Sequence, residues 1–278
     1  MTEGPGAVFL LTDYGEVDEF AGVTRAVVLR SAPGAPVVDL THQIPPFDVR
    51  AGALALARAV VHLGPGVVVA VVDPGVGGGR RAVALAVEAA GGPRYLVGPD
   101  NGLLGWAVDR LGGAVAAVSL APVGGSGGTF DGRDLFAPVA ARLWAGATLH
   151  DVGLPVDPAG LVRLPEPRLV VVVARGDEGA GSVEAEVLWI DRFGNVELAA
   201  RAVEGAGAGL PDVVEVRVGA RRWTARRVVG FDALEGDAVG LLVDANGQLA
   251  LACGRRSAAT VLGVRPGDVV RLGSRGAP

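Results

Sequence analysis

The first half of the chain alternates short apolar runs with segments whose apolar residues recur at helical spacing. The run 67–72 is almost entirely β-branched, which is typical of a strand buried on both faces of a parallel sheet. Strand and helix in alternation indicate a largely parallel sheet with helices on both faces. The pattern predicts strands at 7–11, 36–40, 67–72, 82–87, 95–97 and 114–120, and helices at 18–30, 49–63, 103–111 and 136–144.

The pattern changes at Leu164-Pro165-Glu166-Pro167, after which strands dominate. We therefore expect an N-terminal α/β domain over residues 1–164 and a smaller C-terminal β-barrel domain over 168–278. Asn246-Gly247 predicts a hairpin, because this pair supplies the positive φ that tight turns require. The segment 123–128 is expected to be a flexible loop. The predicted strands of the second half are 169–174, 182–190, 213–218, 239–243 and 248–253.

Composition excludes several chemistries. The chain has 278 residues and 25 basic side chains, all of them arginine. Without lysine it can form neither a Walker-type phosphate loop nor a pyridoxal Schiff base. The glycine-rich stretch after Asp73 also departs from the dinucleotide fingerprint, since Arg80 stands where its third glycine would fall.

Charge and cysteine content narrow the choice of partners. A net charge of -5 with no long basic cluster argues against nucleic acid and is compatible with a cationic small molecule. The single Cys253 excludes an intrachain disulfide, and the three histidines have no metal-ligand spacing, so we expect no metal. No signal-type leader or membrane span is predicted, which favours a cytoplasmic protein.

Acidic residues follow several of the apolar runs. Asp73 comes directly after the run 67–72 and is followed by Arg80 and Arg81, and comparable loops begin at Asp13 and Asp191. A lone Asp-Pro-Gly is most simply a turn. Several such loops at the ends of strands favour a binding site, because open α/β sheets bind ligands beyond the carboxyl ends of their strands.

These loops carry an ordered set of motifs that spans nearly the whole chain. With them, the sequence resembles the S-adenosyl-L-methionine (SAM) hydroxide adenosyltransferase family, adenosine-forming hydrolases related to the fluorinase and chlorinase enzymes. The motifs are Leu10-Leu11-Thr12-Asp13-Tyr14-Gly15 with Asp18, Asp39-Leu40-Thr41-His42-Gln43-Ile44-Pro45-Pro46-Phe47-Asp48, Val72-Asp73-Pro74-Gly75-Val76-Gly77 with Arg80-Arg81, Gly98-Pro99-Asp100-Asn101-Gly102, Thr129-Phe130-Asp131-Gly132-Arg133-Asp134, and Asp191-Arg192-Phe193-Gly194-Asn195.

The resemblance implies hydrolysis of SAM to adenosine and L-methionine by attack of water on the ribose C5′, without a cofactor. It also implies an α/β/α domain, a C-terminal β-barrel, and a homotrimer with sites between the first domain of one subunit and the second domain of its neighbour. A carboxylate at the position of Asp13 holds the ribose in the family. The remaining substrate contacts fall on Asp18, Phe47, Asp191, Asn195 and Phe231.

The resemblance assigns an Asp, an Arg and a His to the attacking water. Asp73 and Arg80 match the first two, although Arg81 could exchange roles with Arg80. Asp131 stands where the family has its histidine, and an aspartate cannot supply a positive charge. Two versions stay open: Asp131 acts as a substitute base, or hydrolysis is slowed while binding persists.

Two other functions are weighed. A non-catalytic protein that binds SAM or adenosine would retain the substrate contacts without turnover. A halide adenosyltransferase is disfavoured, because an anion pays heavily for desolvation beside the carboxylates of Asp73 and Asp131. His42 lies inside a motif, but a hydrogen bond that fixes its loop is the favoured interpretation.

Overall fold

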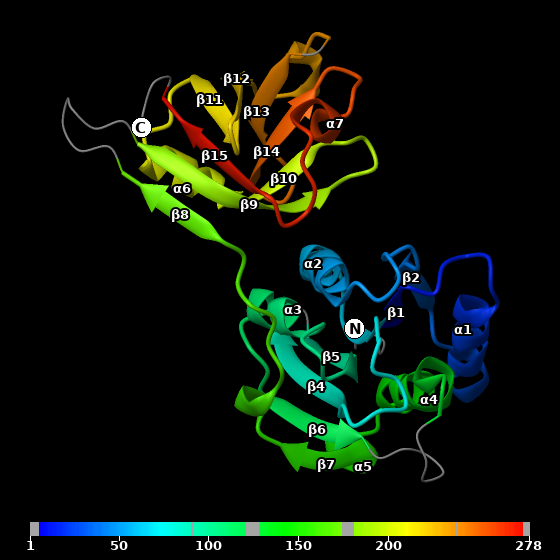
Figure 1. Cartoon of the computed structure of the whole chain (residues 1–278). Helices are drawn as coiled ribbons and strands as arrows, with labels where there is room; N and C mark the ends of the chain where they lie inside the picture. The colour runs from blue at the N-terminus through cyan, green and yellow to red at the C-terminus, as the bar shows by residue number, and fades with distance from the viewer. Residues whose placement is uncertain (1–5, 90–91, 121–127, 174–180, 237, 275–278) are drawn as a thin grey trace. The chain divides into compact units, whose positions relative to one another are not determined.

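The computed structural model describes residues 6–89, 92–120, 128–173, 181–236 and 238–274. The chain divides into two compact units, Met1–Leu164 and Pro165–Pro278. Each is described by itself (Figure 1). Most of the loop expected at 123–128 and the end of the strand expected at 169–174 lie outside the described residues.

The N-terminal unit is built on a seven-stranded sheet of mixed direction, with strand order β2-β1-β3-β5-β4-β6-β7. The first four strands in this order are parallel, and the remaining pairings are antiparallel. The predicted fold class is confirmed, with the parallel part forming the half that carries β1 and β3. The bounds are β1 (Ala7–Thr12), β2 (Val37–Thr41), β3 (Gly66–Val71), β4 (Ala82–Ala89), β5 (Gly92–Pro99), β6 (Ala116–Leu120) and β7 (Gly153–Val156).

Helices cover both faces of this sheet. Side chains of α1 (Phe20–Ser31), α4 (Ala137–Trp144) and α5 (Leu149–Val152) share a core with alternate residues of β1 and β3. The helices α2 (Val49–Ala59) and α3 (Gly105–Arg110) pack against each other on the other side (Figure 1). Every residue of β3 is buried, as its β-branched sequence predicts.

The C-terminal unit is a β-barrel. Seven strands follow the order β10-β14-β13-β12-β11-β15-β9, and pairing of β9 with β10 closes the barrel, while β8 adds to β9 outside it. Alternate apolar side chains fill the interior, so it is a packed core. The bounds are β8 (Leu169–Val172), β9 (Ser182–Ile190), β10 (Val196–Arg201), β11 (Val213–Val218), β12 (Arg221–Arg227), β13 (Val239–Val243), β14 (Gln248–Cys253) and β15 (Val269–Gly273).

The hairpin predicted at Asn246-Gly247 joins β13 to β14. The carboxylate of Asp244 accepts from the backbone N–H groups of Asn246 and Gln248, and Gly247 has φ 79°. The described part of this unit also contains two short α-helices, α6 (Ala202–Gly207) and α7 (Ala258–Leu262), and a 3₁₀ turn, Phe231–Ala233. None of the helices in the described part of the chain combines the length and apolar character needed to cross a bilayer.

Candidate active site

A cavity of about 620 Å³ lies beyond the carboxyl ends of β1, β2 and β3. These strands are neighbours in the parallel half of the sheet, so the loops that follow them meet at one edge. A fourth segment, 129–133, completes the lining. The predicted residues that line this cavity are Asp13, Asp18, Phe47, Asp73 and Asp131.

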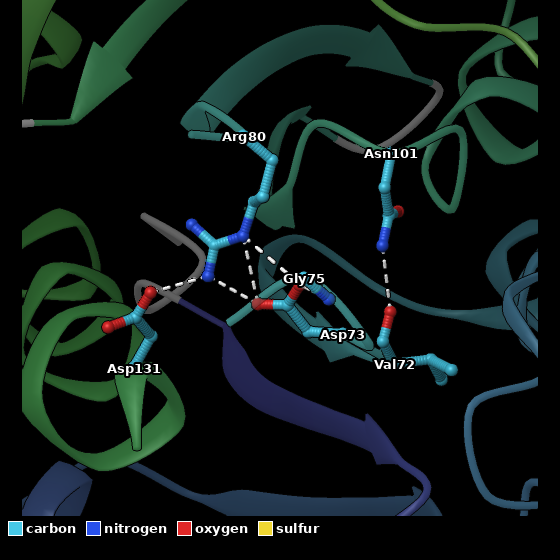
Figure 2. A network of polar contacts seen from close by, with 6 residues as sticks. All are labelled: Val72, Asp73, Gly75, Arg80, Asn101 and Asp131. Atoms are coloured by element: carbon cyan, nitrogen blue, oxygen red, sulfur yellow. Dashed lines mark hydrogen bonds and ion pairs between the residues drawn. The ribbon is translucent and has the colours of Figure 1, made fainter. Parts of the chain in front are cut away.

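Arg80 joins the two carboxylates predicted to act on water (Figure 2). Its Nε donates to Asp73 Oδ1 at 3.1 Å and to Asp73 Oδ2 at 2.9 Å. Its Nη2 donates to Asp73 and also to Oδ2 of Asp131. The side chains of Asp73, Arg80 and Asp131 are 4%, 14% and 14% exposed, so this ion cluster is largely withdrawn from solvent.

The structure separates the roles of the two adjacent arginines. Arg81 donates from Nε to Asp100 Oδ2 at 2.8 Å and from Nη2 to the carbonyl of Gly160 at 2.7 Å. Asp100 is buried and also accepts from the backbone N–H of Val162 at 2.8 Å. Arg81 therefore ties the segment after α5 to the sheet, and Arg80 is the arginine that faces Asp73.

Two hydrogen bonds fix the loop that carries Asp73. Asp73 Oδ1 accepts from the backbone N–H of Gly75 at 3.3 Å. The Asn101 side chain donates to the carbonyl of Val72 at 2.9 Å, immediately before Asp73 (Figure 2). Sequence reasoning left Asn101 out of the site, although its Asp-Asn-Gly motif had drawn attention to it.

Tyr14 is a second residue that sequence reasoning missed. Its ring packs edge-to-face against Phe130 with 5.5 Å between ring centroids, and it lines the same cavity as Asp73 and Asp131. Burial raises the pKa of Tyr14 above its ordinary value, and the carboxylates of Asp13, Asp73 and Asp131 raise it further. The hydroxyl is therefore neutral at physiological pH. Its signal in the sequence was its place directly after Asp13.

Asp13 contacts a strained residue across the cavity. Its Oδ2 accepts from the backbone N–H of Phe47 at 2.9 Å. Phe47 has φ 68°, a left-handed conformation that is unusual for a bulky residue, and its side chain is 71% exposed. Asp18 lines the cavity and is exposed.

The other predicted substrate contacts lie in the barrel. Asp191, Asn195 and Phe231 line a cavity of about 930 Å³ together with Phe193 and Arg256. Asp191 Oδ1 accepts from the backbone N–H groups of Phe193 and Asn195, each at 2.9 Å, and its Oδ2 accepts from the Asn195 side chain at 2.7 Å. Eight of the nine predicted site residues thus line two cavities, one in each unit, and Arg80 contacts two of the residues that line the first.

The remaining candidates have structural partners. His42 is buried, with its Nδ1 2.7 Å from the Thr12 hydroxyl oxygen, and its backbone carbonyl accepts from Gly15 N–H, so it fixes the loop as expected. Arg133 and Asp134 form an exposed ion pair. Within the described ranges, no group of three or more His, Cys, Asp or Glu side chains is arranged to hold a metal ion.

Comparison with known proteins decides the family. Residues 8–153 match the SAM hydroxide adenosyltransferase N-terminal domain, and residues 185–271 match the C-terminal domain of the same family. The chain belongs to the SAM hydroxide adenosyltransferase family. The resemblance of the motifs is thereby confirmed.

Individual members of this family and its neighbours agree with that assignment. The chain is 46% identical to the (R)-S-adenosyl-L-methionine hydrolase of Salinispora tropica over 94% of this chain and 95% of that protein. A fluorinase from an Actinoplanes species is 27% identical over 59% of this chain and 63% of that enzyme. The crystal structure of an uncharacterized conserved protein from Thermotoga maritima superposes with a TM-score of 0.85 at 31% identity, covering 96% of this chain and all of that one.

Proposed function

We propose that this SAM hydroxide adenosyltransferase hydrolyses SAM to adenosine and L-methionine. The relatives are named for the (R) diastereomer, and we assign the same substrate to this chain. The observation that carries the proposal is the position of Arg80, whose Nη2 donates to the carboxylates of both Asp73 and Asp131 beside the N-terminal cavity. Such a cluster can hold and deprotonate one water molecule.

The charge of the cavity suits this reaction. SAM carries a positive sulfonium, and the cavity is lined by four carboxylates, from Asp13, Asp18, Asp73 and Asp131, and by the cation of Arg133. When water attacks C5′, the C5′–S bond breaks with its electrons going to sulfur, and positive charge develops on the water oxygen. Carboxylates beside that oxygen stabilise the developing charge. The same carboxylates would repel an attacking halide. This disfavours halide transfer, the reaction for which the distant fluorinase relatives are named.

The two carboxylates differ in how many hydrogen bonds they accept. Both oxygens of Asp73 accept from Arg80, and Oδ1 also accepts from Gly75. Asp131 accepts from Arg80 at Oδ2, whereas no described residue donates to its Oδ1. We therefore assign Asp73 to orienting the water and Asp131 to accepting its proton. Of the two versions left open by the sequence, this favours Asp131 as a substitute base.

The other roles follow the two cavities. Asp13 binds the ribose hydroxyls, and Phe47 packs against the substrate from the same cavity. Asp18, Asp191 and Asn195 hold the methionine part, and Phe231 supports the adenine. The assignment to two cavities, with the aromatic rings of Phe47 and Phe231 71% and 58% exposed, supports a site shared between subunits of a homotrimer.

The activity is tested by incubating the purified protein with the (R) and (S) diastereomers of SAM separately and measuring adenosine and methionine by chromatography. We expect equal amounts of both products from the (R) form, and none from the Asp73→Ala variant. Added chloride should yield no chlorinated nucleoside. Tight binding of SAM without product would contradict the proposal and favour the non-catalytic binding protein.

The shared site is tested by subunit mixing. Asp73→Ala and Asp191→Ala chains carry defects in different units. Asp73→Ala should be inactive alone, and Asp191→Ala should be slow at SAM concentrations well below its raised KM. If each site combines the two units of neighbouring subunits, random co-assembly leaves about one quarter of the sites intact. Co-expression with two affinity tags should then restore activity, and light scattering should give the mass of a trimer. At such SAM concentrations, a co-purified mixture that is no more active than the Asp191→Ala protein alone would mean that each chain forms its own site.

A further inference from the structure

The hydroxyl group of Tyr14 occupies an unusual position beside Asp131. A Cβ built on Gly132, the next residue, would overlap this hydroxyl, so the absence of a side chain at Gly132 makes room for it. Gly132 begins a π-helical turn, Gly132–Phe136, and Asp131 is the residue that precedes the turn. Single π-helical turns are rare in proteins, and those that occur are often found at functional sites. The chain therefore brings the Tyr14 hydroxyl to the backbone that carries Asp131.

Aromatic contacts hold the ring of Tyr14 in place, whereas its hydroxyl group is available for a hydrogen bond. Phe20 and Phe130 contact the ring edge-to-face, at centroid separations of 6.1 and 5.5 Å. The backbone N–H of Tyr14 donates to the Thr12 hydroxyl at 3.2 Å. The Tyr14 hydroxyl itself makes no hydrogen bond to the residues that the structure describes. Tyr14 lines the cavity and its hydroxyl is not sealed from solvent, so it is free to hydrogen-bond with a ligand or water that enters there.

We propose that the Tyr14 hydroxyl and Asp131 together hold the water that attacks C5′, with Tyr14 as a catalytic residue of the hydrolysis. This inference rests on the proposed function and deepens it. The Oδ1 atom of Asp131 takes one hydrogen of the water, and the Tyr14 oxygen accepts the other. One lone pair of the water oxygen is then directed at C5′, forming the O–C5′ bond as the C5′–S bond breaks toward sulfur. The proton passes to Asp131 and then to solvent.

The short side chain of Asp131 explains why a second group is useful. An aspartate at this position contacts the water from one direction only, and Arg80 already occupies its other oxygen. A neutral hydroxyl both donates and accepts hydrogen bonds, so it can orient the water without adding charge. Because burial and the surrounding carboxylates raise the pKa of Tyr14, its hydroxyl keeps its proton throughout the reaction.

The chain contains one other tyrosine, which provides a matched control. Tyr95 lies in β5 and packs against the core of the N-terminal unit, and it is not among the residues that line the cavity. Tyr14→Phe and Tyr95→Phe each remove one hydroxyl oxygen. We expect Tyr14→Phe to lower kcat by about 10-fold or more with KM and adenosine affinity changed by less than about 2-fold. Tyr95→Phe should keep the wild-type kcat.

Gly132→Ala tests the same contact from the other side. The added methyl group displaces the Tyr14 hydroxyl without removing it, so kcat should fall at least as far as in Tyr14→Phe. In the Tyr14→Phe background, the same substitution should cost less, since the hydroxyl that clashes is gone. This non-additivity separates the contact from two independent losses of stability.

Three experimental results would contradict this inference. A wild-type kcat in Tyr14→Phe would overturn the inference while the proposed hydrolysis stands. A fall in kcat that is matched by an equal loss of adenosine affinity or by a lowered Tm would also overturn it, because it would show a structural role. Absence of adenosine from the wild-type protein would overturn the proposed function and this inference together.

Discussion

The two cavities are built on different principles. In the N-terminal cavity, the ion cluster links residues far apart in sequence, since Arg80 joins Asp73 to Asp131. In the barrel, the hydrogen bonds of Asp191 stay within the loop 191–195. The first site therefore depends on the tertiary fold of its whole unit, whereas the second is organised locally. Loss of the Arg80 cation in the first should disturb chemistry and folding together, and substitutions in the second should mainly change affinity.

The largest effect is expected at Arg80. Arg80→Ala leaves the buried carboxylates of Asp73 and Asp131 without a cation. We expect kcat to fall by about 10³-fold and the free energy of unfolding by about 3 kcal/mol. Arg80→Lys keeps the charge but cannot reproduce the planar contact of Nε and Nη2, so it should recover part of the stability and little of the activity. Urea unfolding and steady-state kinetics measure both quantities.

An exposed pair in the same unit serves as the control. Arg163 pairs with Asp109, and both side chains are about half exposed. Because such pairs are screened by solvent, Arg163→Ala should cost less than about 1 kcal/mol and leave kcat unchanged. Equal destabilisation by Arg80→Ala and Arg163→Ala would show that burial of the Arg80 cluster has no energetic consequence.

The next effect concerns the base. Asp131→Asn retains the shape of the side chain and an oxygen that can accept from Arg80, but it cannot take a proton. We expect turnover to fall by about 10² to 10⁴-fold with SAM binding nearly intact. Asp131→His should match or raise the wild-type activity. Calorimetric titration and product analysis check the prediction, and a fully active Asp131→Asn enzyme would remove Asp131 from the mechanism.

A smaller effect is expected in the barrel. Asp191→Ala removes the acceptor of two backbone bonds and one side-chain bond in its loop. We expect KM for SAM to rise by about 10-fold and kcat to change much less, because we assign this cavity to binding the methionine and adenine parts rather than to the reaction at C5′. Asp191→Asn keeps one acceptor oxygen, so its KM should lie between those of the wild type and Asp191→Ala. A loss confined to kcat would contradict the distinction between the cavities.

The smallest effect concerns pH. All three histidines lie in the N-terminal unit. Burial lowers the pKa of His42 below its ordinary 6.5, and Arg25 lowers it further. The unfolded chain therefore binds a proton at His42 that the folded chain does not, so this contribution to stability is complete above pH 6.5 and is lost as pH falls below it.

Urea unfolding of the wild-type protein and of His42→Gln between about pH 5.5 and 7.5 measures this dependence. The wild-type free energy of unfolding should decrease toward the acid end, and the variant should show a flatter profile. His62→Gln, which changes an exposed histidine, should keep the wild-type slope. Equal slopes in all three proteins would exclude His42 as the origin.

The sequence predicted the parts of the site that depend on local pattern. Asp73 was found because it follows a strand that is apolar on both faces. Which of Arg80 and Arg81 faces Asp73 was not decided, since neighbouring residues in an extended turn point in different directions and only the loop conformation selects one. The places of Tyr14 and Asn101 in the site were not predicted for a related reason: each depends on contact with a segment that is distant in sequence.

The fold shows the same limit. The parallel strands of the first unit were predictable from continuous apolar runs, but β10, β12 and β15 of the barrel were missed. In β12, Arg-Arg-Trp-Thr-Ala-Arg-Arg, Ala225 is the one fully buried residue. Charged side chains on the outer face hide such a strand from a hydrophobic pattern, and only closure of the barrel shows that it is needed.

The hydrogen bond from Phe47 to Asp13 has a consequence for how variants of Asp13 are interpreted. The same carboxylate that is assigned to the ribose also holds a backbone conformation that costs energy to maintain. Truncation to alanine would release the loop as well as the ligand, so its effect on affinity would combine two causes. An asparagine at position 13 could still accept from the backbone N–H of Phe47. The difference in binding free energy between the alanine and asparagine variants would therefore measure how much the preformed loop conformation contributes to substrate binding.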